Sequence, residues 1–151
     1  VPFEQRPWMK SAEITDTLVE AIESGKYDFL RTNFPNGDMV GHTGNYEATI
    51  IGVEAVDLCL ERIMKAVKKV NGILIVTADH GNADEMYEKP KKEGDKPKAK
   101  TSHTLNKVPF IIYNKDVEIA EGDFGLANVA STVAKLLELE PDAHWLPAII
   151  K

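Results

Sequence analysis

The apolar residues of the chain recur at two different spacings along the sequence. Apolar positions three or four residues apart predict helices in three segments, residues 11–24, 46–70 and 126–139. Short apolar runs bounded by turn residues predict strands in three others, residues 27–34, 73–76 and 108–113. Strands separated by helices of this length favour parallel pairing. The pattern therefore predicts a single domain of the α/β class, with a layered α/β/α arrangement around a mostly parallel sheet.

Two segments depart from this alternation. Residues 73–76 (ILIV) are apolar without a break, which is typical of a strand covered on both faces. Residues 84–101 are polar and rich in lysine, and two interpretations stay open for them. One is a solvated loop, and the other is a docking surface for an anionic group. The interspersed acids Glu88, Glu93 and Asp95 dilute the positive charge and favour the loop.

Charge and composition exclude several classes of partner. The chain has 151 residues, is 43% hydrophobic and carries a formal net charge of -6. A broad nucleic-acid or anionic-membrane surface needs a basic excess, so we expect neither partner. No apolar run approaches the roughly 18 residues of a membrane span, and the first residues lack the apolar core of a signal peptide. The single cysteine, Cys59, lies in an apolar stretch and is interpreted as a core residue, which fits a cytoplasmic protein.

Polar residues follow the predicted strands at the positions where α/β proteins place ligand-binding groups. Asp38 and His42 follow the first strand, in a segment expected to be a loop up to Asn45. Asp79 and His80 come directly after the second strand, and His103 lies just before the third. Since ligands of open α/β sheets bind beyond the carboxyl ends of the strands, we expect these side chains to gather there.

Carboxylate and imidazole groups together suit a borderline divalent cation such as Zn²⁺, Mn²⁺ or Fe²⁺. Asp38 and His42 are four residues apart, close enough to bind one ion. Asp79 and His80 are adjacent, so their side chains are expected to diverge and to serve two ions about 3.5–4 Å apart. Gly41 and Gly81 are expected to let the backbone bend around the cluster.

Each of these residues also has an ordinary structural interpretation. Asp38 and Asp79 have the residue type of helix caps and turns, His80 that of a surface histidine, and His103 that of a structural hydrogen bonder. The presence of all of them in loops beside strands favours the metal site. The fourth histidine, His144, stands among prolines without such a carboxylate and is interpreted as packing.

Four blocks of sequence carry a family resemblance. They are residues 36–44 (NGDMVGHTG), 77–82 (TADHGN), 101–110 (TSHTLNKVPF) and 125–133 (GLANVASTV), and residues 10–16 add to them. With these blocks the chain resembles the C-terminal part of the phosphatase domain of cofactor-independent (2,3-bisphosphoglycerate-independent) phosphoglycerate mutases, members of the alkaline-phosphatase superfamily. The resemblance runs nearly end to end and implies an incomplete alkaline-phosphatase-like fold over residues 1–151.

The resemblance implies two manganese ions in the intact enzyme, with zinc or another divalent ion possible. Asp38, His42 and His103 would hold one ion, and Asp79 and His80 would contribute to the second. The implied reaction is the glycolytic interconversion of 3-phosphoglycerate and 2-phosphoglycerate through a phosphoserine. The metals lower the pKa of that serine and neutralise phosphate oxygens. The intact enzyme is expected to be a monomer that binds phosphoglycerate.

The chain lacks parts that the family uses. The nucleophilic serine, one aspartate ligand of the second metal and the substrate-binding domain belong to segments without a counterpart here, so no catalytic or substrate-binding residue is assigned. Ser102, beside His103, is the only serine near the proposed site and is not expected to replace the nucleophile. We therefore expect a mutase fragment that is inactive alone and that self-associates through exposed strand edges.

Two other functions are compatible with the residues. One is a small stand-alone metal-dependent phosphatase or phosphodiesterase, which would use metal-bound hydroxide in place of serine. The other is a non-catalytic, metal-stabilised binding module whose lysine-rich loop docks a partner. The block at residues 38–44 (DMVGHTG) favours the mutase over both.

Overall fold

The computed structural model describes residues 1–90, 92 and 94–151. These residues form two compact units, unit 1 over residues 1–114 and unit 2 over residues 115–151. Unit 1 contains the helices η1 (Phe3–Gln5), α1 (Ser11–Ser24), α2 (Asn36–Gly41) and α3 (Tyr46–Lys69). Its strands are β1 (Leu74–Thr77), β2 (Tyr87–Glu88), β3 (Lys98–Ala99) and β4 (Phe110–Tyr113). The predicted α/β class is confirmed, with small and incomplete sheets.

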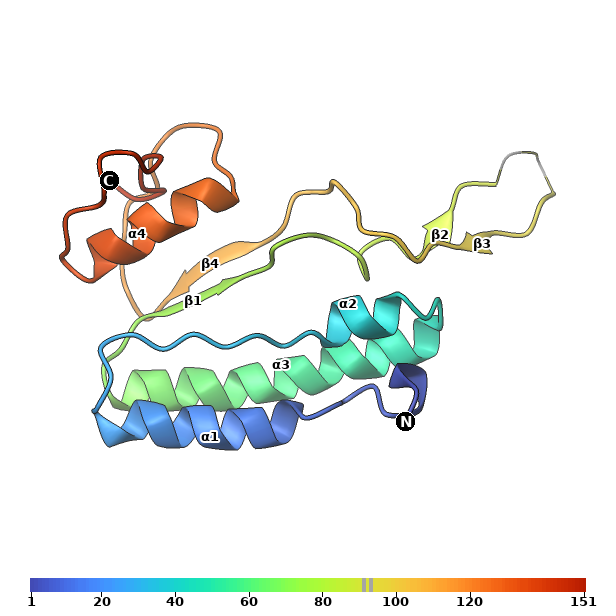
Figure 1. Cartoon of the computed structure of the whole chain (residues 1–151), viewed down its shortest axis with the longest axis horizontal. Coiled ribbons are helices and arrows are strands. Elements are labelled where there is room, and N and C mark those ends of the chain that lie inside the picture. Colours follow the sequence, from blue (N-terminus) through green and yellow to red (C-terminus); the bar gives the residue numbers. More distant parts are fainter. Residues whose placement is uncertain (91, 93) are drawn as a thin grey trace. The chain divides into compact units, whose positions relative to one another are not determined.

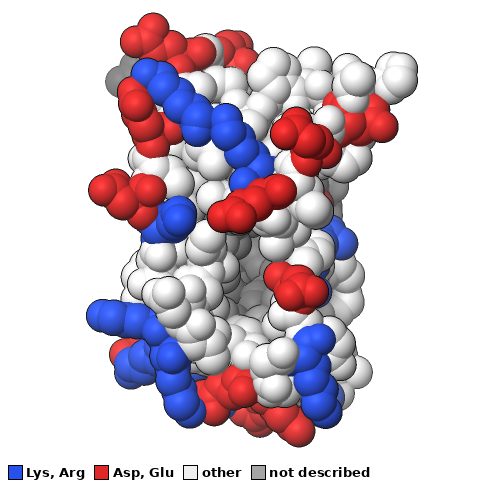
Figure 2. Space-filling view, turned by 90° about the vertical axis from the view of Figure 1, so that its left-hand side faces the viewer, with Lys and Arg blue, Asp and Glu red and all other residues white. Residues whose placement is uncertain are grey.

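The helices α1 and α3 lie side by side and run in the same direction (Figure 1). Two ion pairs are consistent with this parallel alignment. Asp16 pairs with Arg62, and Glu23 pairs with Lys69 over 2.8 Å, and the partners of each pair are 46 residues apart. These pairs are exposed and add little to stability. Figure 2 shows basic and acidic side chains interspersed on one face of the molecule.

The helix α3 begins and ends close to its predicted bounds because its signals are local. The side chain of Asn45 accepts a hydrogen bond from the backbone N–H of Ala48 and caps the first turn. At the other end Asn71 adopts a positive φ of 54°, and the N–H of Gly72 bonds back to the carbonyl of Val67. Cys59 is a buried free thiol on this helix, as the core interpretation predicted.

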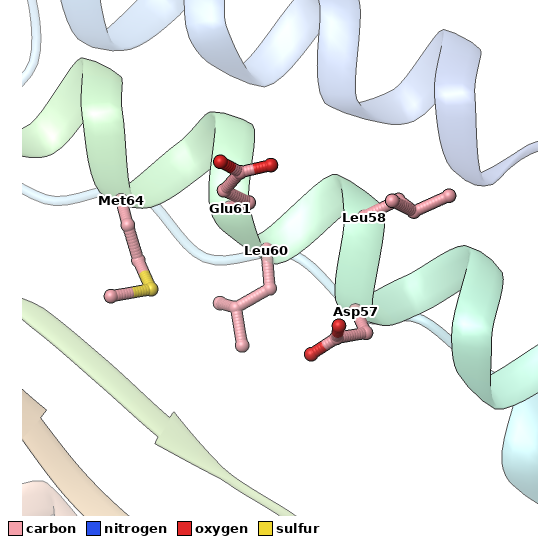
Figure 3. Close-up of a pocket in the computed structure, with 5 residues that line it drawn as sticks. All are labelled: Asp57, Leu58, Leu60, Glu61 and Met64. Carbon is pink, nitrogen blue, oxygen red and sulfur yellow. The ribbon is translucent and has the colours of Figure 1, made fainter.

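The other side of α3 is only half covered. Figure 3 shows Leu60 and Met64 pointing to the same side of the helix, away from α1. Together with Asp57, Leu58 and Glu61 they line an open pocket of about 270 Å³. All five residues belong to α3, and none is a predicted metal ligand. The pocket therefore lies apart from the chemistry that the sequence indicates.

Strand pairing differs from the prediction. Within the described residues both ladders are antiparallel, β1 with β4 and β2 with β3, so the expected mostly parallel sheet is wrong for this chain. The described residues of the connection from β1 to β4 include no helix to carry the chain back, so the chain reverses and pairs antiparallel. Residues 27–34 run extended without a strand partner in the described structure, because a strand needs a neighbour at hydrogen-bonding distance.

The strand β1 is less covered than its apolar sequence predicts. All three apolar residues of β1 are half-buried, and on its partner β4 Ile111 is 51% exposed. The prediction of a strand covered on both faces is therefore wrong within the described residues. The register places Leu74 opposite Tyr113 and Thr77 opposite Phe110.

The described part of the lysine-rich stretch forms the short β2–β3 hairpin. Glu93, one of the acids in the prediction, lies outside the described residues. The hairpin is anchored by Tyr87, whose ring lies 5.6 Å from that of Tyr46 at the start of α3. It also packs on Gly44, where a Cβ would come within 3.1 Å of Ala99. This positive-φ glycine brings the hairpin next to the segment that carries His42.

Unit 2 is a short helical unit closed by the chain's last residues. It contains η2 (Leu126–Asn128) and α4 (Val129–Leu136), where the sequence predicted one helix over residues 126–139. Asn128 donates from its amide to the carbonyl of Pro147, and the hydroxyl of Thr132 accepts from the N–H of Ile149. His144 is almost fully exposed and bonds to Asp142, so the interpretation as packing was wrong. Among the described residues, no helix is long and apolar enough to cross a membrane.

Candidate metal centre

The helix α2 positions the first two candidate ligands. Asp38 and His42 lie one turn apart, with the N–H of His42 bonded to the carbonyl of Asp38, so the expected loop over these residues is a helix. Pro35 precedes the helix and its carbonyl accepts from Met39, closing the first turn. The side chain of Asn36 is fully buried and donates to the carbonyl of Pro7, which holds α2 against the N-terminal segment.

Two side chains of α2, Asp38 and His42, and one from a distant segment, His103, converge on one point. The Oδ1 atom of Asp38 lies 3.0 Å from Nε2 of His42 and 3.1 Å from Nε2 of His103. The two imidazole Nε2 atoms are themselves 3.1 Å apart. One oxygen and two nitrogens thus surround a space of the size and donor type that a divalent cation occupies.

The orientation of His42 makes this cluster suited to a cation. Its Nδ1 lies 2.6 Å from the carbonyl oxygen of Thr101, which can only accept, so Nδ1 carries the proton. In the neutral ring the lone pair of Nε2 then points toward the Asp38 carboxylate, and two acceptors face each other. A cation between them satisfies both groups, as in other sites where a backbone carbonyl orients a metal-binding histidine.

The second pair of candidates lies beside this cluster. The ring of His80 stacks on that of His103, with centroids 3.7 Å apart and an angle of 18° between the planes. Its Nε2 lies 4.0 Å from Oδ1 of Asp38 and 3.7 Å from Oδ1 of Asp79. Asp79 and His80 do not diverge as expected, because the chain bends after β1 rather than continuing as an extended strand.

Exposure divides the five residues. Asp38 and His80 are partly buried, whereas the side chain of Asp79 is 83% exposed. Asp79 therefore faces solvent with a free side for further ligands. Ser102 is also exposed.

The environment of Asp38 favours its ionised form. Burial acts to raise the pKa of Asp38, but the hydrogen bond from Asn82 and the positive charge that His42, His103 and His80 carry in their protonated forms outweigh it. The pKa of this carboxyl group is therefore lower than usual, and the group is an anion at neutral pH.

The sequence interpretation missed several residues that support the ligands. Asn82 donates to the Asp38 carboxylate over 2.9 Å, and the carbonyl of Thr101 orients His42. Asp84 accepts hydrogen bonds from Thr104 and Asn106, next to His103 in the sequence. The only sequence signal for Asn82 is its place in the 77–82 block. Backbone carbonyls such as that of Thr101 leave no sequence signal.

Residues 1–141 of the chain match the family described as the metalloenzyme superfamily. The chain belongs to the metalloenzyme superfamily. It is 46% identical over 163 aligned residues to a 2,3-bisphosphoglycerate-independent phosphoglycerate mutase of Trypanosoma brucei brucei, with all of this chain and 30% of the relative covered. A probable mutase of the same name from Leptospira interrogans is 46% identical over 161 residues, with 100% and 29% covered.

A solved structure gives the same result. Phosphoglycerate mutase of Leishmania mexicana, determined at low cobalt concentration, superposes with a TM-score of 0.91 at 45% identity. The match covers 100% of this chain and 30% of the Leishmania chain. The resemblance to these mutases is therefore confirmed along the whole chain. The chain spans about 30% of the length of the relatives it matches.

Proposed function

We propose that this chain is the metal-binding portion of a cofactor-independent phosphoglycerate mutase, which interconverts 3-phosphoglycerate and 2-phosphoglycerate through a phosphoserine. The convergence of Asp38, His42 and His103 on one point carries the proposal. Mutases of this name are similar to the chain along its whole length, which supports the choice of reaction. The match to the metalloenzyme superfamily supports a divalent ion as cofactor.

The donor set supports two ions of the manganese class. The first ion would be held by Asp38, His42 and His103, and the second by Asp79 and His80 with ligands from outside this chain. The carboxylate of Asp79 is exposed, so ligands from outside this chain could bind the same ion beside it. When bound, the ions supply Lewis-acid stabilisation of phosphoryl oxygens and of an ionised serine.

The residues of this chain would hold that arrangement in place. Asp38 supplies the negative charge at the centre of the cluster, and the carbonyl of Thr101 keeps Nε2 of His42 directed toward it. The stacking of His80 on His103 supports an arrangement in which the two ions would lie side by side. The nucleophilic serine and the groups that bind the glycerate would come from the part of the relatives that this chain does not span.

A segment exchange tests the proposal. In the Trypanosoma relative, the matched segment is replaced by residues 1–151 of this chain, and conversion of 3-phosphoglycerate is measured with Mn²⁺ present. We expect the exchanged protein to be active, the chain by itself to be inactive, and H42A or H103A in the exchanged protein to reduce kcat at least 100-fold. H144A is the matched control and should leave activity unchanged, since His144 is a solvent-exposed histidine outside the cluster.

Three results would contradict the proposal. A folded exchanged protein without mutase activity would argue against the reaction. Activity that survives H42A and H103A together would argue against the ion site. Steady conversion of 3-phosphoglycerate by residues 1–151 alone would argue against a separate nucleophile.

A further inference from the structure

Asn82 is a buried amide directed at the proposed metal site. Its residue is 4% exposed, and its Nδ2 lies 2.9 Å from Oδ1 of Asp38 and 3.3 Å from the carbonyl oxygen of the same residue. The bond therefore reaches the same carboxylate oxygen that faces His42 and His103.

The orientation of the amide is determined by its surroundings. Both atoms of Asp38 that it meets are acceptors, so the NH₂ end must face them, since the flipped amide would place three acceptors together. The Oδ1 atom of Asn82 then points the other way, where it is buried and has no hydrogen-bond partner among the described residues. A buried unpaired oxygen is costly, so its presence needs a reason.

Gly41 is shaped to fit this amide. A Cβ at Gly41 would lie 2.5 Å from Oδ1 and 3.0 Å from Cγ of Asn82. Gly41 is itself buried and ends α2, one residue before His42. Because Gly41 has no side chain, the amide of Asn82 fits beside it. The NH₂ group of this amide is hydrogen-bonded to Asp38, and its oxygen is unpaired among the described residues.

From these contacts we propose that Asn82 is a positioning residue for the metal-binding carboxylate of Asp38, and that Gly41 is its steric counterpart. This inference rests on the proposed metal site. By donating to Oδ1, the amide fixes the χ angles of Asp38 so that this oxygen stays between His42 and His103. Outer hydrogen bonds of this kind orient metal ligands, and losing one weakens metal affinity about 10- to 100-fold.

The substitution N82L separates positioning from folding. Leucine has a similar size, and it removes both the donor to Asp38 and the unpaired oxygen. We expect N82L to bind Mn²⁺ 10- to 100-fold more weakly by calorimetry, as predicted for a lost outer-sphere bond, while the metal-free chain keeps the wild-type Tm in EDTA.

N128L is the matched control. Asn128 is also a buried asparagine, but its amide donates to Pro147 and its oxygen accepts from Gly125 in unit 2. We expect N128L to lower Tm and to leave Mn²⁺ affinity at the wild-type value. A lower Tm of N82L with unchanged Mn²⁺ affinity would overturn the inference, because Asn82 would then be structural only.

A double-mutant cycle gives a second test that does not depend on the folding of N82L. G41A should weaken Mn²⁺ binding in the wild-type background, because the new methyl group displaces the amide. In the N82A background the methyl group meets no amide, so G41A should cause little further loss. Equal effects of G41A in both backgrounds would overturn the pairing. A wild-type chain that binds no Mn²⁺ would overturn the proposed metal site itself, which is a different result from an unchanged affinity in N82L.

Discussion

Thr104 donates its backbone N–H to the carbonyl of Gly81 over 2.9 Å, and this bridge joins the segment of His80 to the segment of His103. The side chains of Thr104 and Asp84 also lie close to Gly81. A Cβ at Gly81 would lie 2.1 Å from the hydroxyl oxygen of Thr104 and 2.5 Å from Oδ1 of Asp84. The stacking of His80 on His103 therefore requires a glycine at position 81, where the two segments meet.

The substitution G81A should separate the two histidine segments. The new methyl group would meet the hydroxyl of Thr104 and the carboxylate of Asp84. These two groups are hydrogen-bonded to each other, so moving either one away from the methyl group strains that hydrogen bond. We expect a loss of about 1–3 kcal/mol in the free energy of unfolding, as for other overpacked sites, together with weaker Mn²⁺ binding. Urea unfolding and calorimetry measure the two effects. G37A is the control, since a Cβ at Gly37 would make only ordinary contacts, 3.8 Å from Ala83 and 4.0 Å from Val53. A loss of stability as large as that of G81A would contradict the steric argument.

Metal addition should stabilise the chain through Asp38, His42 and His103. A ligand that binds only the folded state raises the free energy of unfolding by about 2.7 kcal/mol at a concentration 100 times its Kd. We expect this rise in the wild-type chain on adding Mn²⁺ and its reversal by EDTA. The rise should disappear in H42A and persist in H144A. Equal stabilisation of H42A and the wild-type chain would show that the ion binds elsewhere.

Asp84 should make stability depend on acid pH. The hydrogen bond from Asn106 lowers the pKa of this carboxyl group most, burial opposes it, and the Thr104 hydroxyl lowers it further. The folded pKa lies below the ordinary value of about 3.9, so the stabilisation is complete above that value and is lost as the pH falls through the folded pKa.

The substitution D84N checks this dependence. We expect the difference in unfolding free energy between wild type and D84N, measured with urea in EDTA, to be largest above about pH 5 and to shrink below about pH 4. Asp84 is an exposed residue, so the difference is expected to be small. Two curves that stay parallel from pH 7 to pH 3 would contradict the assignment.

The packing of α3 gives a prediction that is independent of metal. Ile63 is 3% exposed in the core of unit 1, whereas Leu58 on the same helix is 66% exposed. I63A should cost about 2–5 kcal/mol of unfolding free energy, because it leaves a cavity. L58A removes a side chain of equal size from solvent and should stay within about 0.5 kcal/mol of wild type. Chemical denaturation of the two variants compares them directly, and equal losses would mean that the exposed face of α3 is covered in solution.

The helices were the most predictable part of the fold. The predicted helix over residues 46–70 is found as Tyr46–Lys69, because apolar spacing, the Asn45 cap and the Asn71–Gly72 stop all lie within or next to it. The strands were less predictable. Residues 27–34 have the composition of a strand, but pairing requires a neighbour that local sequence does not specify.

The candidate site also has a part that the sequence predicts and a part that it does not. The residue types of Asp38, His42, Asp79, His80 and His103, and their positions beside predicted strands, indicate a metal site from the sequence alone. The supporting contacts did not follow from the pattern, because the partners are far apart in the sequence. Asn82 and Asp38 are separated by 44 residues, and Thr101 and His42 by 59 residues.

The sequence by itself determined the main helices, the residue types available for chemistry and the resemblance to a mutase, because these depend on local spacing and on the identity of each residue. The tertiary structure alone decided the antiparallel pairing of β1 with β4 and the meeting of Asp38, His42 and His103 at about 3 Å. It also revealed the buried amide of Asn82 behind them. Contacts between distant segments depend on how the whole chain packs, and that information is spread over many residues and appears in no single motif.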